Sequence, residues 1–209
     1  MHMQSKPIIK WHNVVVTALP GAGSTTLAKR LAQRLDWEYF SGGEFMRAYA
    51  ISKGLFDPTT KTHHHANTYS PDFDRQVDYG MRSNMQEKRG IVYDAWLSGF
   101  LAQGVKDTFK ILCECSNDGV RVDRLANRDG ITIQEAKEHI FDRERKNVAK
   151  WNKMYRQEWQ DWVVKPGYVA KHKKQYYWYH EMYDLVIDTY TVSKQEAYDL
   201  AWRELTKGV

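Results

Sequence analysis

The chain has 209 residues, of which 42% are hydrophobic and 27% are charged, and its formal net charge is +5. These proportions are ordinary for a soluble globular protein, and no apolar run approaches the length that spans a bilayer. The first residues also lack the apolar core of a signal peptide. We therefore expect a cytoplasmic protein with no membrane partner, whose positive charge suits a nucleotide or a nucleic acid.

One domain can account for a chain of this length. The two cysteines, Cys113 and Cys115, lie two positions apart in an apolar run. They would point to the same side of a strand. We expect buried thiols here rather than a disulfide or a metal-binding pair.

The first predicted unit runs from Val14 to Leu35 and combines three patterns. A β-branched run at 14–19 predicts a buried strand, and apolar residues at helical spacing over 27–35 predict an amphipathic helix. The loop between them is small and glycine-rich. Its unpaired N–H groups and the dipole of the following helix both favour phosphate. The predicted anion-binding residues are Gly21, Ala22, Gly23, Ser24, Thr25 and Thr26.

This loop departs from the P-loop pattern G-x-x-x-x-G-K-[ST] at two positions. Gly23 takes the second glycine, and Thr25 takes the hydroxyl position that holds magnesium. Ser24 stands where the lysine belongs, and Ala18 stands where the first glycine belongs. A plain glycine turn between a strand and a helix is therefore the alternative, and the loop alone does not decide between the two.

Strand and helix patterns alternate along the rest of the chain. Capping boxes mark the starts of two helices, one at Thr132 with Glu135 and one at Ser193 with Glu196. Short apolar runs predict further strands at 37–40, 91–94, 109–115 and 183–188. The alternation predicts an α/β fold with a five-stranded parallel sheet that helices cover on both faces.

Polar or flexible positions follow several of these strands. They are the loop at Gly21, the break at Ser41 and Gly42, Asp94, and Thr189. Ligands of an open α/β sheet bind at the carboxyl ends of its strands. We therefore expect these positions to converge on one site.

A run of three histidines, His63 to His65, lies in a polar, irregular stretch. Three adjacent histidines cannot all face one metal from regular structure. We expect a solvated loop rather than a metal site.

Five stretches, in this order along the chain, resemble the nucleoside monophosphate kinases and most closely the short cytidylate kinases of archaeal type. They cover most of the chain except about residues 55–70 and 151–180. The matching stretches are Leu19–Thr26, Trp37–Arg47, the helix with Asp74 and Arg75, Arg121–Gly130 and Tyr183–Thr189. The resemblance implies one domain, residues 1–209, with a P-loop NTPase-type three-layer α/β/α fold. Its helical lid and insertion would span about 129–182.

The resemblance also implies an activity, which is phosphoryl transfer from ATP, with Mg²⁺, to a nucleoside monophosphate such as cytidylate. Main-chain amides of residues 21–25 would hold the donor phosphates. Thr25 and Asp94 would lie near the metal, and Asp94 could instead accept a hydroxyl proton or simply cap a loop. Arg124 and Arg128 resemble the pair that lies along the donor nucleotide.

Three more arginines match functional positions of these kinases. Arg47 resembles the arginine that binds the acceptor monophosphate, and Arg143 and Arg145 fall in the lid, where cations act catalytically on the transferring phosphoryl group. Phosphoryl transfer needs such groups because it consists mainly of positioning and charge neutralisation. For each arginine taken singly, a solvated helix face is the alternative.

Two positions depart from the resemblance. Ser24 replaces the lysine that follows the donor phosphates, and Trp96 replaces a phosphate-binding arginine at a strand end. Either another cation substitutes, with Lys29, Arg143 and Arg145 as candidates, or catalysis is weak or absent. Trp96 would stack on an acceptor base or fill space that a different substrate leaves.

The insertion at 151–180 alternates aromatic and basic side chains. Aromatic rings for stacking and cations for phosphates suit single-stranded nucleic acid. We favour the other interpretation, in which an enlarged lid packs its aromatic residues on the body or on a second subunit of a homo-oligomer.

The leading hypothesis is thus an ATP-dependent nucleotide kinase. The second is a nucleotide-binding module with weak or no catalysis, and the third is a kinase that acts on nucleotides within a nucleic acid. The sequence leaves open the acceptor base, the sugar preference, the oligomeric state and the role of the insertion.

Overall fold

The computed structural model describes residues 9–54 and 70–208. Within them lies one five-stranded sheet with the strand order β2-β3-β1-β4-β5, and every neighbouring pair of strands is parallel. The strands are β1 (Asn13–Ala18), β2 (Glu38–Ser41), β3 (Ile91–Asp94), β4 (Thr108–Glu114) and β5 (Leu185–Asp188). The predicted fold class is confirmed, and each predicted strand lies within two residues of an observed one. The histidine run at 63–65 lies outside the described residues.

Helices flank this sheet. The α-helices are α1 (Ser24–Leu35), α2 (Gly42–Ser52), α3 (Pro71–Glu87), α4 (Ser98–Leu101), α5 (Asp118–Asp129), α6 (Ile133–Lys137), α7 (Arg143–Met154), α8 (Arg156–Trp159) and α9 (Lys194–Leu205). Two π-helical segments, Glu138–Asp142 and Gln160–Val164, and a 3₁₀ turn, His180–Met182, complete them. Both predicted capping boxes form, at Thr132 and at Ser193. None of the helices among the described residues combines the length and apolarity needed to cross a membrane.

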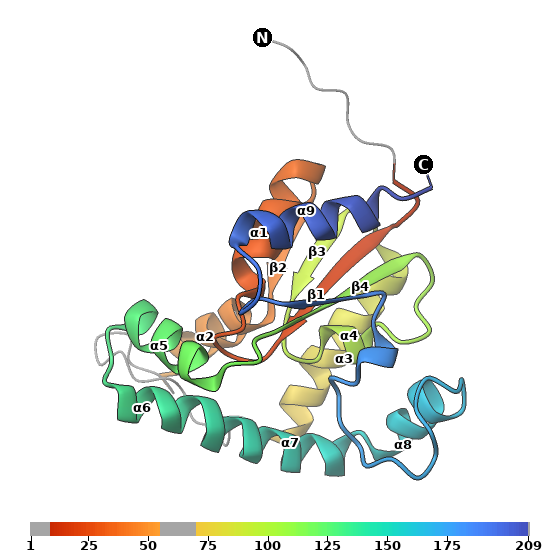
Figure 1. Cartoon of the computed structure of the whole chain (residues 1–209). Helices are drawn as coiled ribbons and strands as arrows, with labels where there is room; N and C mark the ends of the chain where they lie inside the picture. Colours follow the sequence, from red (N-terminus) through yellow and green to blue (C-terminus); the bar gives the residue numbers. More distant parts are fainter. Residues whose placement is uncertain (1–8, 55–69, 209) are drawn as a thin grey trace.

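The central strand β1 divides the core into two layers because successive side chains of a strand point to opposite faces. Val14 and Val16 face the layer formed with α1 and α9, whereas Val15 faces the layer formed with α3, α4 and the insertion. Figure 1 shows α1 and α9 on one side of the sheet and α3, α4, α7 and α8 on the other. Cys113 and Cys115 are buried free thiols, as predicted.

The lid region is a nearly continuous helical rod. In Figure 1, α6 and α7 run along the lower edge of the molecule, below α5. The π-helical segment Glu138–Asp142 lies between them, directly before Arg143. Such segments insert an extra residue into a helix and are frequent at functional sites. The periodicity predicted the helix but not this segment.

The aromatic insertion packs into the core beside the sheet. Of its nine aromatic residues at 151–179, five are buried: Trp151, Tyr155, Trp159, Tyr177 and Trp178. Phe100 of α4 packs against four aromatic rings of the insertion. These five buried rings pack on the body and are not available to stack on bases.

Candidate active site

A cavity of about 1010 Å³ opens at the carboxyl ends of the strands. The glycine loop, the start of α2, the end of β3, α5 and the first residue of α7 contribute to its walls. Ser41, Asp94 and Thr189 all line it. The residues that follow the strands therefore line one cavity, as predicted.

The glycine loop adopts a conformation that only glycine accommodates easily. Gly21 and Gly23 have φ angles of +79° and +87°, in the region where other residues are strained. A Cβ atom on Gly21 would also lie 2.5 Å from the main-chain oxygen of Arg121. Helix α1 then begins at Ser24 with no side chain capping it. The loop thus directs uncapped N–H groups and a helix dipole toward the cavity, which is the arrangement that binds phosphate.

Asp94 ends β3 beside this loop. Its Oδ2 accepts hydrogen bonds from the Thr25 hydroxyl, at 2.8 Å, and from the Tyr39 hydroxyl, at 3.0 Å. Burial raises the pKa of Asp94, while hydrogen bonds from Thr25, Ser24 and Tyr39 lower it. Its hydroxyl neighbours therefore stabilise a charged carboxylate that burial disfavours.

The oxygen atoms of Thr25 and Asp94 suit Mg²⁺. This ion prefers oxygen ligands and is commonly held by one or two carboxylates together with substrate phosphates. No group of three or more His, Cys, Asp or Glu side chains in the described parts of the chain could hold a metal alone. The pair fits a metal that arrives with a nucleotide.

Two predicted donor-site arginines lie on α5. The guanidinium of Arg124 donates to the Gly21 main-chain oxygen at 3.3 Å and to the Thr189 hydroxyl at 2.9 Å. It therefore fastens the glycine loop to the end of β5. Arg128 lines the cavity, remains 56% exposed and pairs with Asp129.

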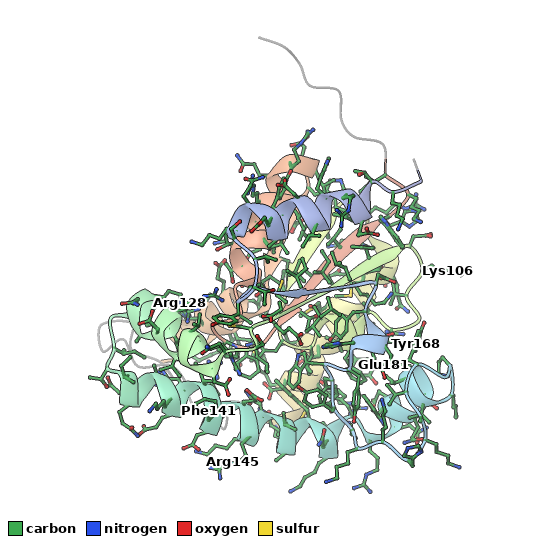
Figure 2. The ribbon with its side chains drawn as sticks, viewed as in Figure 1. Lys106, Arg128, Phe141, Arg145, Tyr168 and Glu181 are labelled. Atoms are coloured by element: carbon green, nitrogen blue, oxygen red, sulfur yellow. The ribbon has the colours of Figure 1, made fainter. Side chains whose placement is uncertain are left out.

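Three other predicted residues meet in the same cavity. Arg47, Trp96 and Arg143 all line it, and the Arg143 guanidinium carbon lies 5.2 Å from the centre of the Trp96 ring. Arg145 does not line it. The Arg145 side chain is 74% exposed, pairs with Asp142, and extends from α7 away from the sheet (Figure 2). The structure thus separates the two lid arginines that the sequence treated alike.

Lys29, the remaining candidate cation, lies outside the cavity wall. Its ammonium is 3.0 Å from a carboxylate oxygen of Glu44 and lies over the Tyr39 ring. Glu44 itself lines the cavity. Of the three substitutes considered for the missing lysine, only Arg143 lines the cavity in this structure.

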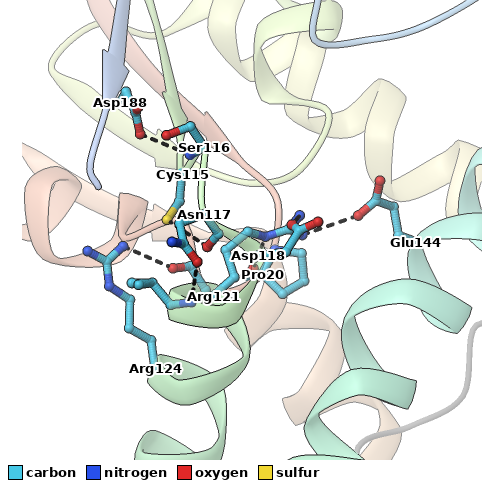
Figure 3. Close-up of polar contacts among 11 residues, drawn as sticks. Pro20, Cys115, Ser116, Asn117, Asp118, Arg121, Arg124, Glu144 and Asp188 are labelled. Atoms are coloured by element: carbon cyan, nitrogen blue, oxygen red, sulfur yellow. Dashed lines mark hydrogen bonds and ion pairs between the residues drawn. The ribbon is translucent and has the colours of Figure 1, made fainter. Parts of the chain in front are cut away.

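Sequence reasoning missed Arg121, whose side chain is 9% exposed. It donates to the Pro20 main-chain oxygen at 3.2 Å and to Glu144 of α7 at 3.2 Å, as Figure 3 shows. It therefore joins the glycine loop to the lid. Sequence spacing gave no signal for this role, because the partners lie 101 and 23 residues away.

A smaller cavity of about 120 Å³ adjoins the first and lies between α2, α3 and α7. Asp74 and Lys150, which form an ion pair, line it together with Asn147. Gly43, Trp96 and Arg143 line both cavities. These three residues mark the border between the two spaces.

A phosphate-binding loop and a buried carboxylate at the carboxyl edge of a parallel sheet define a P-loop protein, and the arginines around the cavity are of the kind that phosphoryl transfer requires. The sequence model of the cytidylate kinase-like family matches residues 13–191. The chain belongs to this family and is a nucleotide kinase by descent.

Curated relatives agree with that placement. The cytidylate kinase of Methanopyrus kandleri is 28% identical over 199 residues, which are 90% of this chain and 91% of the relative. The cytidylate kinase of Ignicoccus hospitalis is 31% identical over 144 residues, which are 68% of this chain and 79% of the relative.

Solved structures agree on the fold. An uncharacterized protein from Eubacterium ventriosum superposes with a TM-score of 0.61 at 13% identity, over 94% of this chain and 99% of the other. A putative kinase from Chloroflexus aurantiacus gives a TM-score of 0.50 at 13% identity, over 97% and 100%. At such identities the likeness concerns the fold alone.

Proposed function

We propose that the protein transfers the γ-phosphoryl group of ATP to a nucleoside monophosphate, with cytidylate as the first acceptor to test. The observation that carries the proposal is that one cavity combines the uncapped start of α1 with Arg47 and Arg143. One end suits the phosphates of a donor, and the arginines suit a second anionic group. The names of the curated relatives support cytidylate as the acceptor.

In this proposal each group of the chain has a positioning role. The main-chain amides of residues 21–25 bind the donor phosphates, and Arg124 holds the loop in the shape that they need. Arg128 lies along the donor nucleotide, and Arg47 binds the acceptor phosphate. Thr25 and Asp94 would hold Mg²⁺, which neutralises phosphate charge when bound.

Ser24 leaves this site without the ammonium that usually accompanies the loop. Removing one clamp on a developing anion costs about 3 to 4 kcal/mol, or about 10² to 10³ in rate. Arg143 lines the cavity and carries a permanent charge. We assign the compensating role to Arg143 rather than to Lys29 or Arg145.

A coupled assay tests the proposal. The full chain is supplied with ATP, Mg²⁺ and each common ribo- and deoxyribonucleoside monophosphate, at high enzyme concentration. The expected result is turnover with cytidylate above the others. Turnover with none of them, while calorimetry detects ATP binding, would contradict the proposal.

A nucleotide-binding module without catalysis is the second candidate, and Ser24 is the observation that favours it. The variant Ser24→Lys separates the two candidates. A kinase limited by this charge gains activity on the substitution. A module that lacks other catalytic groups binds ATP more tightly but still shows no turnover.

A further inference from the structure

We infer that Trp96 is a positioning residue, which holds the Arg143 guanidinium at the border of the two cavities, and that the aromatic insertion serves to keep Trp96 in place. The inference rests on the proposed kinase function and deepens it. It assigns a role to a segment whose sequence suggested a binding surface.

The border between the cavities is where a cation is useful. Gly43, Trp96 and Arg143 line both spaces, and Arg143 is the one among them that carries a charge. The glycine loop and Arg47, to which the proposed function assigns the donor and acceptor phosphates, line the same large cavity as Arg143. A guanidinium fixed there stabilises the transferring group without having to reorganise.

Trp96 provides the surface on which that guanidinium lies. The Arg143 guanidinium carbon is 5.2 Å from the ring centre, within the distance at which a cation and an aromatic face attract each other. Arginine also stacks on aromatic rings through its flat, delocalised group. The ring therefore limits the directions in which Arg143 can point.

Two residues from opposite ends of the insertion hold Trp96. The Trp151 ring meets it edge-on, with ring centres 5.8 Å apart and an angle of 79°. The Trp178 indole nitrogen donates to the Trp96 main-chain oxygen at 3.0 Å. Trp151 and Trp178 are buried and also contact each other. The insertion thus contacts Trp96 through both of its ends.

The helix that carries Arg143 is fixed at its far end as well. Lys150 of α7 pairs with Asp74 of α3, and the Tyr155 hydroxyl, just beyond α7, donates to Asp78 of α3 at 2.6 Å. Arg143 is therefore placed by the anchored helix behind it and by the ring beneath it.

A double-mutant cycle on the full chain tests this inference. The variants are Trp96→Leu, Trp96→Phe, Arg143→Ala and the double variant Trp96→Leu/Arg143→Ala. The matched control is Lys146→Ala, which removes an exposed cation one turn further along α7. For each protein, kcat and KM are measured with cytidylate and ATP, calorimetry gives the Kd of ATP, and thermal melts monitor folding.

We expect Arg143→Ala to lower kcat/KM by about 10² to 10³ and Trp96→Leu to lower it by about tenfold, mainly through kcat. Trp96→Phe, which retains an aromatic face, should recover most of the loss. The double variant should be no worse than Arg143→Ala alone, because Trp96 acts through Arg143. Lys146→Ala should match the wild type.

Full activity of Trp96→Leu, no recovery by phenylalanine, or losses that add in the double variant would each overturn the inference. If the wild-type chain turns over no monophosphate, the proposed function fails, and the ATP Kd then decides the inference. The inference stands if Arg143→Ala and Trp96→Leu each weaken ATP binding and the double variant weakens it no further than Arg143→Ala. Additive or absent effects on the Kd overturn it.

Discussion

The hydroxyl of Thr25 lies 2.8 Å from Oδ2 of Asp94, which joins the first turn of α1 to the end of β3. The two residues are 69 positions apart, and only the parallel pairing of β1 with β3 brings them together. Because the glycine loop follows β1 directly, the same pairing places a carboxylate beside that loop. The sheet order thus determines the chemistry available at the loop.

This relationship predicts a specific dependence on magnesium. Asp94→Asn keeps the shape of the side chain but removes the negative charge that would face the metal. We expect the Mg²⁺ concentration for half-maximal activity to rise at least tenfold, while the Kd of metal-free ATP falls or stays constant because a repulsive charge is gone. Titration of activity against Mg²⁺ and calorimetry with ATP in EDTA measure the two quantities. An unchanged magnesium requirement would remove Asp94 from the metal site.

The glycine loop predicts a contrast between two glycines. Gly21→Ala places a Cβ against the Arg121 main-chain oxygen at a φ of +79°, and the left-handed conformation alone costs alanine about 1 to 2 kcal/mol. The loop must shift, so we expect ATP binding to weaken at least tenfold. The control, Gly80→Ala, is on α3 with nothing within 4 Å of the added carbon. It should retain ATP binding and stabilise the fold by up to about 1 kcal/mol.

Calorimetry with ATP and urea denaturation check both glycine variants. Equal ATP affinity in wild type and Gly21→Ala would show that the loop tolerates another shape. The strained position would then not define the phosphate site.

The two lid arginines predict unequal effects. Arg143 lines the cavity, whereas Arg145 is 74% exposed and pairs with Asp142 across one helical turn. Exposed ion pairs contribute about 0 to 1 kcal/mol. We therefore expect Arg145→Ala to change kcat/KM less than threefold, against a loss of two orders of magnitude or more for Arg143→Ala. Comparable losses would mean that the lid turns Arg145 inward during the reaction.

The two lid arginines show which features the sequence alone could not predict. The strands, the loop and both capping boxes follow from patterns within a few residues of each other, and all of them were predictable. Arg143 and Arg145 are the same residue type and lie only two positions apart in the sequence. Residues two positions apart on a helix point to different sides. The sequence alone could not say which of the two faces the cavity, because the π-helical segment directly before Arg143 changes the helix register and was not predicted.

Side-chain contacts between residues far apart in the sequence could not be predicted either. The contacts of Arg121 with Pro20 and Glu144 depend on how the lid packs on the loop. The insertion supplied aromatic and basic residues in a pattern that fits either nucleic acid or a core. The rings that pack around Phe100 include buried ones and agree with a core. The sequence could not show this packing, because α4, which carries Phe100, was itself not predicted.

The last prediction concerns pH and the junction between α3 and the insertion. Burial is the main cause that raises the pKa of Asp78 to about 7; the charge of Asp74 adds to the effect and the hydrogen bond from Tyr155 opposes it. The folded protein therefore keeps this proton at a higher pH than the unfolded chain, in which the pKa of aspartate is about 4. Between about pH 4 and 7 the folded state binds more protons, so the stabilising contribution of Asp78 is complete below this range and is lost as the pH rises through it.

In Asp78→Asn that dependence disappears, while the amide oxygen still accepts from Tyr155. The free energy of unfolding of the variant, relative to wild type, should increase from pH 5 to pH 7 and level off above about pH 8. Urea denaturation across this range measures the free energy of unfolding.

The companion variant Tyr155→Phe removes the hydrogen bond that lowers the pKa of Asp78. The pH-dependent loss of stability in this variant should therefore extend to higher pH than in wild type. Parallel curves for wild type and Asp78→Asn would show that this carboxyl is ionised throughout and that its burial is relieved in solution.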